Sequence, residues 1–249
     1  MVIKMDKVNI LGVNVDTVTI SQAADKIMEF FNEDRIHTVF TPNSEIIMAA
    51  YRDPEFCEML NNSDLLTADG IGVVYASRIL KKPINERAAG YDIARKVLEK
   101  LNYTNHKLFL FGGKPGVADE AAANLKKEYP ELNIVGTRNG YFSADDEADI
   151  VNEINASGAD IVFVCLGAPK QEKWINAHKD ELKVRVAMGI GGSLDVFAGR
   201  VERAPDFWCK IGMEWFYRLV KEPWRIGRMM DLPKFAATVI TKGKKYKQD

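Results

Sequence analysis

Asp69 is the carboxylate of this chain that is best placed for chemistry, because it lies where an apolar segment meets a glycine-flanked turn. Leu65-Leu66-Thr67-Ala68 leads into this residue, and Gly70 and Gly72 follow it. Ligands of open α/β sheets bind outside the carboxyl ends of the strands, where a carboxylate can accept a proton as a general base. The alternative is that Asp69 caps a helix that begins at Ile71, and position alone favours the cap.

Three further glycine-rich turns follow predicted strands, at residues 112–116, 166–172 and 189–195. Phosphate-binding turns occur in this context, although no dinucleotide fingerprint or P-loop is present and tight turns explain the glycines equally well. Gln171 could bond a ligand or face water, and Asp195 could accept hydrogen bonds from ribose hydroxyls. Taken together, the turns favour a nucleotide-sized ligand. The candidate binding residues in these turns are Gly113, Gly167, Gln171, Gly191 and Asp195.

Arginines are the candidates for binding a diphosphate, because the sequence contains no recognisable metal motif. His37, His106 and His178 are isolated from one another, so we expect no divalent metal. Charge that develops on a leaving phosphate then needs arginines or helix N-termini. Arginine suits the task because its planar fork binds phosphate through two hydrogen bonds. The candidates are Arg87, Arg218, Arg225 and Arg228.

The elements that must position these residues alternate between strand and helix as far as residue 198. This alternation predicts a Rossmann-like, mostly parallel α/β sheet that is flanked by helices. The predicted strands are 8–15, 37–40, 64–68, 107–111, 133–137, 161–166 and 184–189. The predicted helices are 20–31, 44–50, 54–61, 71–80, 91–101, 117–129, 145–156, 169–178 and 194–198.

The C-terminal part of the chain differs in charge and pattern, which predicts a core over residues 1–200 and a helical appendage over 201–249. From Arg200 onward there are twelve Lys and Arg against six Asp and Glu, a net charge of +6 that leaves −7 for the rest. Helices are predicted over 205–220 and 223–230, and three of the four tryptophans lie here. Basic and aromatic side chains together suit a lipid surface, an anionic ligand or nucleic acid, whereas a solvated charged face is the alternative.

Composition places the chain among folded globular proteins, with 47% hydrophobic and 28% charged residues over 249 positions. No apolar run is long enough to span a bilayer, and the first residues do not resemble a signal peptide. The three cysteines are widely spaced, so neither a zinc site nor a disulfide framework is indicated. We expect a cytoplasmic protein with reduced cysteines.

A set of short motifs along the chain resembles the WecG/TagA/CpsF glycosyltransferase family. The motifs, in order, are Thr41-Pro42-Asn43, Thr67-Ala68-Asp69-Gly70, the segment 86–90 with Arg87, the segment 167–172, and Gly189-Ile190-Gly191-Gly192. The resemblance covers essentially the whole chain, including the basic tail. The combined set is far more specific than any single motif.

The resemblance implies transfer of N-acetylmannosamine from UDP to the 4-hydroxyl of N-acetylglucosamine on undecaprenyl diphosphate, in wall teichoic acid synthesis. It further implies inversion at the sugar carbon, no metal cofactor, and a peripheral enzyme on the inner face of the cytoplasmic membrane. Asp69 corresponds to the general base and Arg87 to a pocket arginine. The other implied residues are Thr41, Asn43 and Gln171 in the pocket and Arg218, Arg225 and Arg228 in the tail.

Alternative functions remain open at this point. A related transferase of exopolysaccharide synthesis would use another UDP sugar, and a non-catalytic module would bind a nucleotide sugar without transferring it. A nucleotide-dependent oxidoreductase is disfavoured by the missing dinucleotide fingerprint. We expect no nucleic-acid partner, and the sequence leaves open whether the core self-associates and whether the tail packs on the core, on a second subunit or on lipid.

Overall fold

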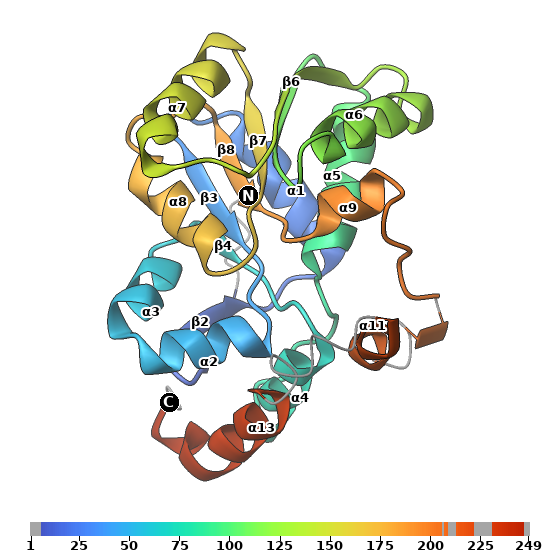
Figure 1. Cartoon of the computed structure of the whole chain (residues 1–249). Coiled ribbons are helices and arrows are strands. Elements are labelled where there is room, and N and C mark those ends of the chain that lie inside the picture. Colours follow the sequence, from blue (N-terminus) through green and yellow to red (C-terminus); the bar gives the residue numbers. More distant parts are fainter. Residues whose placement is uncertain (1–5, 206, 209–212, 222–230, 247–249) are drawn as a thin grey trace.

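The computed structural model describes residues 6–205, 207–208, 213–221 and 231–246. Within these ranges the central element is a sheet of six parallel strands in the order β4-β3-β8-β7-β5-β6 (Figure 1). This confirms the predicted parallel α/β sheet. The strands are β3 (His37–Phe40), β4 (Leu65–Leu66), β5 (Lys107–Gly112), β6 (Asn133–Arg138), β7 (Ile161–Cys165) and β8 (Val186–Gly189).

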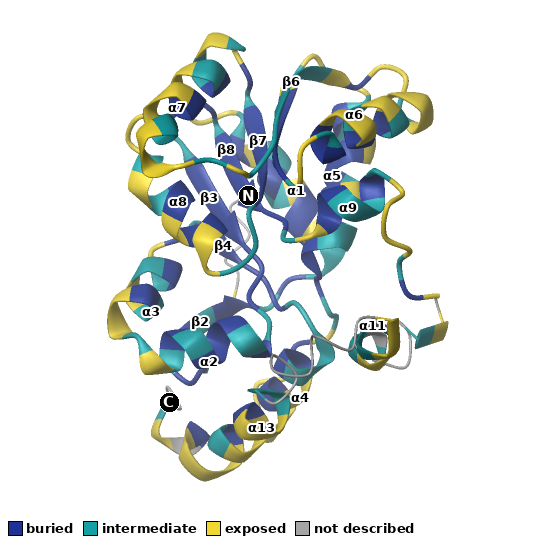
Figure 2. Ribbon diagram, viewed as in Figure 1, coloured by how far each residue is buried: buried dark blue, intermediate teal, exposed yellow. Residues whose placement is uncertain are grey.

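Successive side chains of each strand point to opposite sides of the sheet, so an apolar strand presents apolar side chains on both faces. Helices cover and bury both faces. In β5, Leu108 and Leu110 belong to one core cluster and Phe109 and Phe111 to the other. The buried strands lie between exposed outer helix faces (Figure 2). The first cluster includes side chains of α1 (Ile20–Phe30), α5 (Gly90–Leu101), α6 (Val117–Glu128) and α9 (Ser193–Phe197). The second includes side chains of α2 (Ser44–Arg52), α3 (Pro54–Asn61), α4 (Ile71–Ile79), α7 (Glu147–Ala156) and α8 (Lys170–His178).

The predicted strand 8–15 is wrong in one respect, because the structure folds it into a hairpin of β1 (Lys7–Ile10) and β2 (Val13–Asp16). Leu11 and Gly12 make the turn with φ values of 55° and 103°, the left-handed region that glycine adopts readily. Asp16 at the end of β2 accepts a hydrogen bond from the Leu66 nitrogen at 2.9 Å. The hairpin is thereby fixed beside β4, the strand that leads to Asp69.

The C-terminal segment also departs from the prediction. Helix α11 (Glu214–Lys221) occupies only part of the predicted helix 205–220, since Met213 is not helical. The predicted helix 223–230 lies outside the described residues. Helix α13 (Asp231–Lys242), followed by a short 3-10 helix at Gly243–Tyr246, was not predicted.

Helix α13 packs on α2 and α4 and contributes two side chains to the core. Phe235 and Val239 are only 2% and 1% exposed, and Arg52 pairs with Asp231 at 2.9 Å. Figure 1 shows α13 lying beneath α2 and beside α4. The last helix is therefore attached to the core, whereas the predicted domain boundary after residue 200 remains a prediction.

Replacing Phe235 with Ala is expected to lower the free energy of unfolding by about 3–5 kcal/mol, because it removes a buried ring from a packed cluster. Urea unfolding followed by circular dichroism measures the change. Ile240→Ala, on the same helix, is the matched control, since Ile240 is 61% exposed and its loss should cost little. Equal effects of the two substitutions would contradict the docking of α13.

Candidate functional site

The candidate site residues of the core lie along the carboxyl edge of the sheet. Asp69 follows β4, Thr41 follows β3, Gly191 follows β8, Gly167 follows β7 and Gly113 follows β5, which is the order of the strands across the sheet. In Figure 1 this edge faces the lower half of the molecule, where α2, α4 and α13 lie. The fold therefore brings together residues that are far apart in the sequence, as expected for ligand sites in open α/β sheets.

Asp69 does not cap α4, so the cap alternative is wrong. Gly70 holds the N-cap position of α4 with a φ of 93° and makes no side-chain cap bond. The Asp69 Oδ2 atom instead accepts a hydrogen bond from the Gly90 nitrogen, at the start of α5, at 3.3 Å. The Asp69 backbone nitrogen donates to the Pro42 oxygen at 3.1 Å. The half-buried carboxylate thus lies at the positive end of a twelve-residue helix, where negative charge is stabilised.

Thr41 and Asn43 flank this carboxylate on the turn between β3 and α2. A Cβ atom at Gly90 would lie 2.7 Å from the Thr41 Oγ1 atom, so only glycine fits where α5 meets buried Thr41. Asn43 caps α2, because its Oδ1 atom accepts from the Ile46 nitrogen at 3.0 Å. Its amide nitrogen has no hydrogen-bond partner in the described part of the chain, which leaves a donor for a ligand.

Arg87 is placed next to the same helix start. Its Nη2 atom lies 3.2 Å from Oδ2 of Asp92 in the first turn of α5, and its side chain is only 17% exposed. Together with Asp69, Thr41 and Asn43, it completes a cluster around the N-terminus of α5. The structure therefore assembles the candidate base, two neutral pocket residues and one arginine in a single region.

Gln171 is buried rather than facing water, and its side chain and backbone together connect two turns. Its Oε1 atom accepts from the Gly191 nitrogen at 3.0 Å, and its backbone nitrogen donates to the Gly167 oxygen at 2.9 Å. A Cβ atom at Gly189 would lie 2.9 Å from Nε2 of Gln171, so the strand end leaves room for the amide. Gln171 thus holds the turns after β7 and β8 in place, while Gly167 and Gly191 face open space there.

Glu172 is a residue to which the sequence assigned no role, although it adjoins Gln171 in the same motif. Its Oε1 atom accepts a hydrogen bond from Nε2 of Gln171 at 2.8 Å, and its side chain is fully buried. Its Oε2 atom has no hydrogen-bond partner among the described residues. Burial raises the pKa of this carboxyl, which favours the protonated form. A neutral Glu172 that orients the Gln171 amide fits both observations.

Glu172→Gln is expected to be more stable than the wild type, by a margin that grows as the pH rises above 4.5, the ordinary pKa of a glutamate carboxyl. The folded wild type retains a proton that the unfolded chain releases, so this group's contribution to stability is present below the unfolded pKa. It is lost as the pH rises through the folded pKa, at about 1.4 kcal/mol for each unit of difference. Urea unfolding of both proteins between about pH 4 and about pH 8 measures the difference. A difference that stays constant with pH would contradict a buried, protonated Glu172.

The backbone of Gly113 is hydrogen-bonded to neighbouring segments, and its binding role remains a prediction. Its nitrogen donates to the Cys165 oxygen at 3.1 Å, and its oxygen accepts from the Gly140 nitrogen at 2.8 Å. The N–H group of Gly113 is therefore not available to a phosphate. Asp195 in α9 is half-buried, and its carboxylate has no hydrogen bond or ion pair with other described residues. Its binding role remains a prediction.

Comparison with known proteins identifies the family. The sequence model of the WecG/TagA/CpsF glycosyl transferase family matches residues 8–249. The chain belongs to the WecG/TagA/CpsF family of glycosyltransferases. The family match extends over the core and over the C-terminal segment, so the resemblance read from the motifs is confirmed.

Two similar curated proteins share the name N-acetylglucosaminyldiphosphoundecaprenol N-acetyl-beta-D-mannosaminyltransferase. The protein of that name from Bacillus subtilis (strain 168) is 37% identical over 224 residues, which cover 90% of this chain and 87% of the relative. The one from Staphylococcus aureus (strain MRSA252) is 36% identical over 244 residues, which cover 97% and 95%. Both similarities therefore include the strand ends that carry the candidate site.

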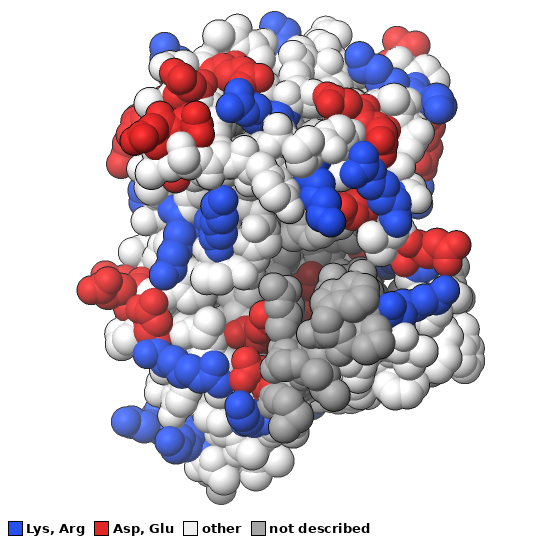
Figure 3. Space-filling view, in the orientation of Figure 1, with Lys and Arg blue, Asp and Glu red and all other residues white. Residues whose placement is uncertain are grey.

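Of the three tail arginines, Arg218 has its backbone in helix α11. The Arg218 side chain, Arg225 and Arg228 lie outside the described residues. Phe216 and Val220 of α11 are 38% and 63% exposed. In Figure 3, Lys and Arg side chains alternate with Asp and Glu over the face shown, rather than forming a surface of one sign.

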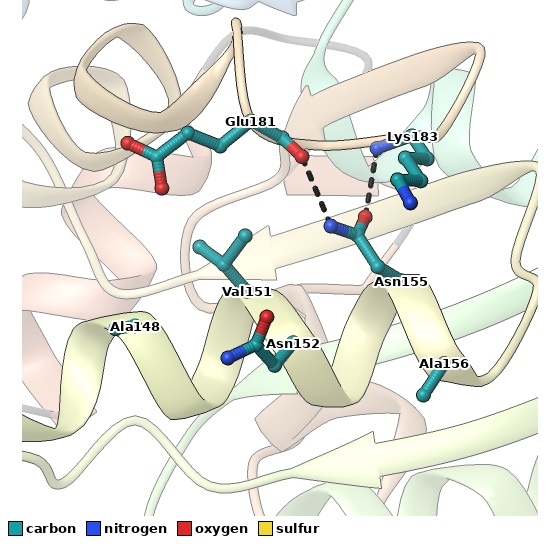
Figure 4. Close-up of a pocket in the computed structure, with 7 residues that line it drawn as sticks. All are labelled: Ala148, Val151, Asn152, Asn155, Ala156, Glu181 and Lys183. Atoms are coloured by element: carbon teal, nitrogen blue, oxygen red, sulfur yellow. Dashed lines mark hydrogen bonds between the residues drawn. The ribbon is translucent and has the colours of Figure 1, made fainter.

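A surface hollow of about 620 Å³ lies away from the candidate site, between α7 and the loop that precedes β8 (Figure 4). It lies at the amino edge of the sheet, opposite the strand ends described above. Asn155 in this hollow donates to the Glu181 oxygen at 2.9 Å and accepts from the Lys183 nitrogen at 2.7 Å. Its amide therefore holds the loop in place, and we assign the hollow no catalytic role.

Proposed function

We propose that the chain transfers N-acetylmannosamine from UDP to the 4-hydroxyl of N-acetylglucosamine on undecaprenyl diphosphate, in wall teichoic acid linkage-unit synthesis. The names of its relatives support this donor sugar and this acceptor. The observation that carries the mechanism is the placement of Asp69, whose carboxylate lies at the carboxyl edge beside α5 instead of capping α4. Substrate can approach this edge in a fold of this kind.

In the proposed reaction, the acceptor O4 atom attacks the anomeric carbon of the donor from the side opposite UDP. The new C–O bond forms as the bond from the anomeric carbon to the phosphate oxygen breaks, and UDP leaves with the bonding electron pair. Asp69 takes the proton from O4, so one carboxylate is sufficient for an inverting transfer.

Arginines stabilise the negative charge that develops on UDP in this scheme, and no divalent metal is required. Arg87 supplies one guanidinium within the cluster, and Arg218, Arg225 and Arg228 are proposed to supply others from the tail. A well-placed donor in a site that excludes water contributes about 3 kcal/mol to the transition state. Thr41, Asn43 and the turns held by Gln171 would orient the sugars.

Attachment to the cytoplasmic face of the membrane is part of the proposal, because the acceptor is a lipid. None of the helices that the structure describes is both long and apolar enough to cross a bilayer. Exposed apolar side chains on α4, α11 and α13 support peripheral attachment, since they can enter the headgroup region. They are Tyr75 and Ile79 on α4, Phe216 and Val220 on α11, and Ile240 on α13.

A donor panel tests the proposed function. The full chain is incubated with a short-chain lipid diphosphate that carries N-acetylglucosamine and with one UDP sugar at a time, and the products are identified by mass spectrometry. We expect the UDP-N-acetylmannosamine reaction to be the most efficient. Transfer of a hexose or of N-acetylmannosaminuronic acid instead would favour an exopolysaccharide enzyme. Binding of UDP sugars without release of UDP would leave only a binding module.

A further inference from the structure

Asp92 connects two arginines that come from distant parts of the chain. Its Oδ2 atom accepts from Nη2 of Arg87 at 3.2 Å, and its Oδ1 atom accepts from Nη2 of Arg203 at 2.5 Å. The side chains of Arg87, Asp92 and Arg203 are 17%, 18% and 26% exposed, so the interactions are largely shielded from water. Shielding makes such pairs more directional and less sensitive to salt than pairs on an open surface.

Arg203 is held by a second contact to the same helix turn. Its guanidinium carbon lies 4.6 Å from the centre of the Tyr91 ring, within the range of a cation–π interaction. Tyr91 in turn stacks on Phe197 of α9, with ring centres 5.1 Å apart. The first turn of α5 therefore fixes the start of the C-terminal segment against the core.

The same turn also contacts the candidate base, because Gly90 donates to Asp69. Consecutive residues at the start of α5 thus reach Asp69, Arg203 and Arg87. Two guanidinium groups therefore share one carboxylate next to the base. A nucleoside diphosphate is the ligand class that a pair of guanidinium groups fits, since arginine pairs with phosphate through two hydrogen bonds.

We propose that Asp92 is a positioning residue that holds Arg87 and Arg203 as a pair for the diphosphate of the donor. The inference rests on the proposed function, in which Arg87 stabilises departing UDP. Asp92 orients the arginines through its two oxygen atoms and itself stays out of contact with substrate. Arg203 becomes, by the same argument, a diphosphate-binding residue at the beginning of the C-terminal segment. The competing explanation is that Asp92 only complements the positive end of α5.

A mutant cycle separates the two explanations. UDP affinity by titration calorimetry and kcat for transfer are measured on the full chain for the wild type, Asp92→Ala, the variant with both Arg87→Ala and Arg203→Ala, and the variant with all three substitutions. Asp92→Ala is expected to lower both quantities about tenfold when the two arginines are present and less than about twofold when both are absent. Losses of equal size in both backgrounds would show an independent structural effect and would overturn the proposal.

Two further variants keep the result interpretable. Asp92→Asn retains one oxygen acceptor and is expected to recover part of the loss, whereas recovery of none of it in a well-folded protein would contradict positioning. Glu120→Ala is the matched control, because it releases Arg200 from a more exposed pair with contacts of 2.7 and 2.8 Å. It should leave UDP affinity and kcat unchanged, and an effect as large as that of Asp92→Ala would overturn the proposal.

The affinity measurement also distinguishes failure of this inference from failure of the proposed function. If the wild type binds UDP but transfers no sugar, the proposed function fails, while the cycle in UDP affinity still decides the role of Asp92. If the wild type does not bind UDP, the assignment of the arginine pair to a diphosphate is overturned as well.

Discussion

Asp69→Asn is expected to lower kcat for sugar transfer by about 10²–10⁴-fold, the usual contribution of a general base, with a small change in the KM of the donor. The amide cannot take the proton of the acceptor hydroxyl. It does retain an oxygen that can accept from the Gly90 nitrogen, so the fold around α5 should be preserved. Steady-state transfer kinetics together with thermal unfolding measure the two effects.

Asp53→Asn is the matched control for Asp69→Asn. Asp53 is an N-cap, because its side chain accepts from the Phe56 nitrogen at 3.1 Å at the start of α3. Asparagine caps a helix about as well as aspartate, so this variant should keep both stability and kcat. Wild-type kcat in Asp69→Asn, or a loss of stability that accounts for its loss of activity, would refute the role of Asp69 as the base.

Arg87→Ala is expected to lower kcat by about 10²–10³-fold, the effect of removing one well-placed donor from a developing negative charge. Arg87→Lys should recover only part of this activity, because the ammonium group lacks the planar fork that binds phosphate through two bonds. Transfer kinetics at saturating donor measure the loss of kcat. UDP affinity shows how much binding energy Arg87 already contributes in the ground state.

Arg95→Ala provides the control for Arg87→Ala. Arg95 lies within α5, pairs with Glu128, and its side chain is 45% exposed. Removal of this surface arginine should leave kcat unchanged. If Arg87→Ala were as active as Arg95→Ala, UDP departure would not depend on the arginine of this cluster.

Much of the fold could be predicted from local patterns, because each buried strand is a short apolar run that ends at a polar or glycine-rich turn. The hairpin at Leu11 and Gly12 was missed since an alternating pattern does not reveal a left-handed turn in its middle. Helix α13 was missed because its core contacts, through Phe235 and Val239, are non-local. Deletion of all residues after 200 would remove these two side chains and destabilise the core. Single substitutions therefore test the role of the tail in activity more cleanly than a truncation.

The site was predicted less completely than the fold. The sequence located Asp69, Thr41, Asn43 and Arg87, and the structure brings them together at the start of α5. Geometry alone could reveal that Asp69 lies against α5 rather than α4, because the Gly90 contact spans 21 residues. The sequence likewise could not predict that Asp92 joins two arginines, since an acidic residue in a first helical turn is ordinarily explained by the helix dipole.

The anomeric configuration of the newly formed linkage tests the account most directly. The wild-type product from UDP-N-acetylmannosamine, in which the sugar is α-linked to UDP, is purified and its linkage assigned by NMR. A single base at Asp69 and direct displacement of UDP predict a β-linked disaccharide. An α-linked product would contradict the account, because retention requires a different mechanism from attack opposite the leaving group.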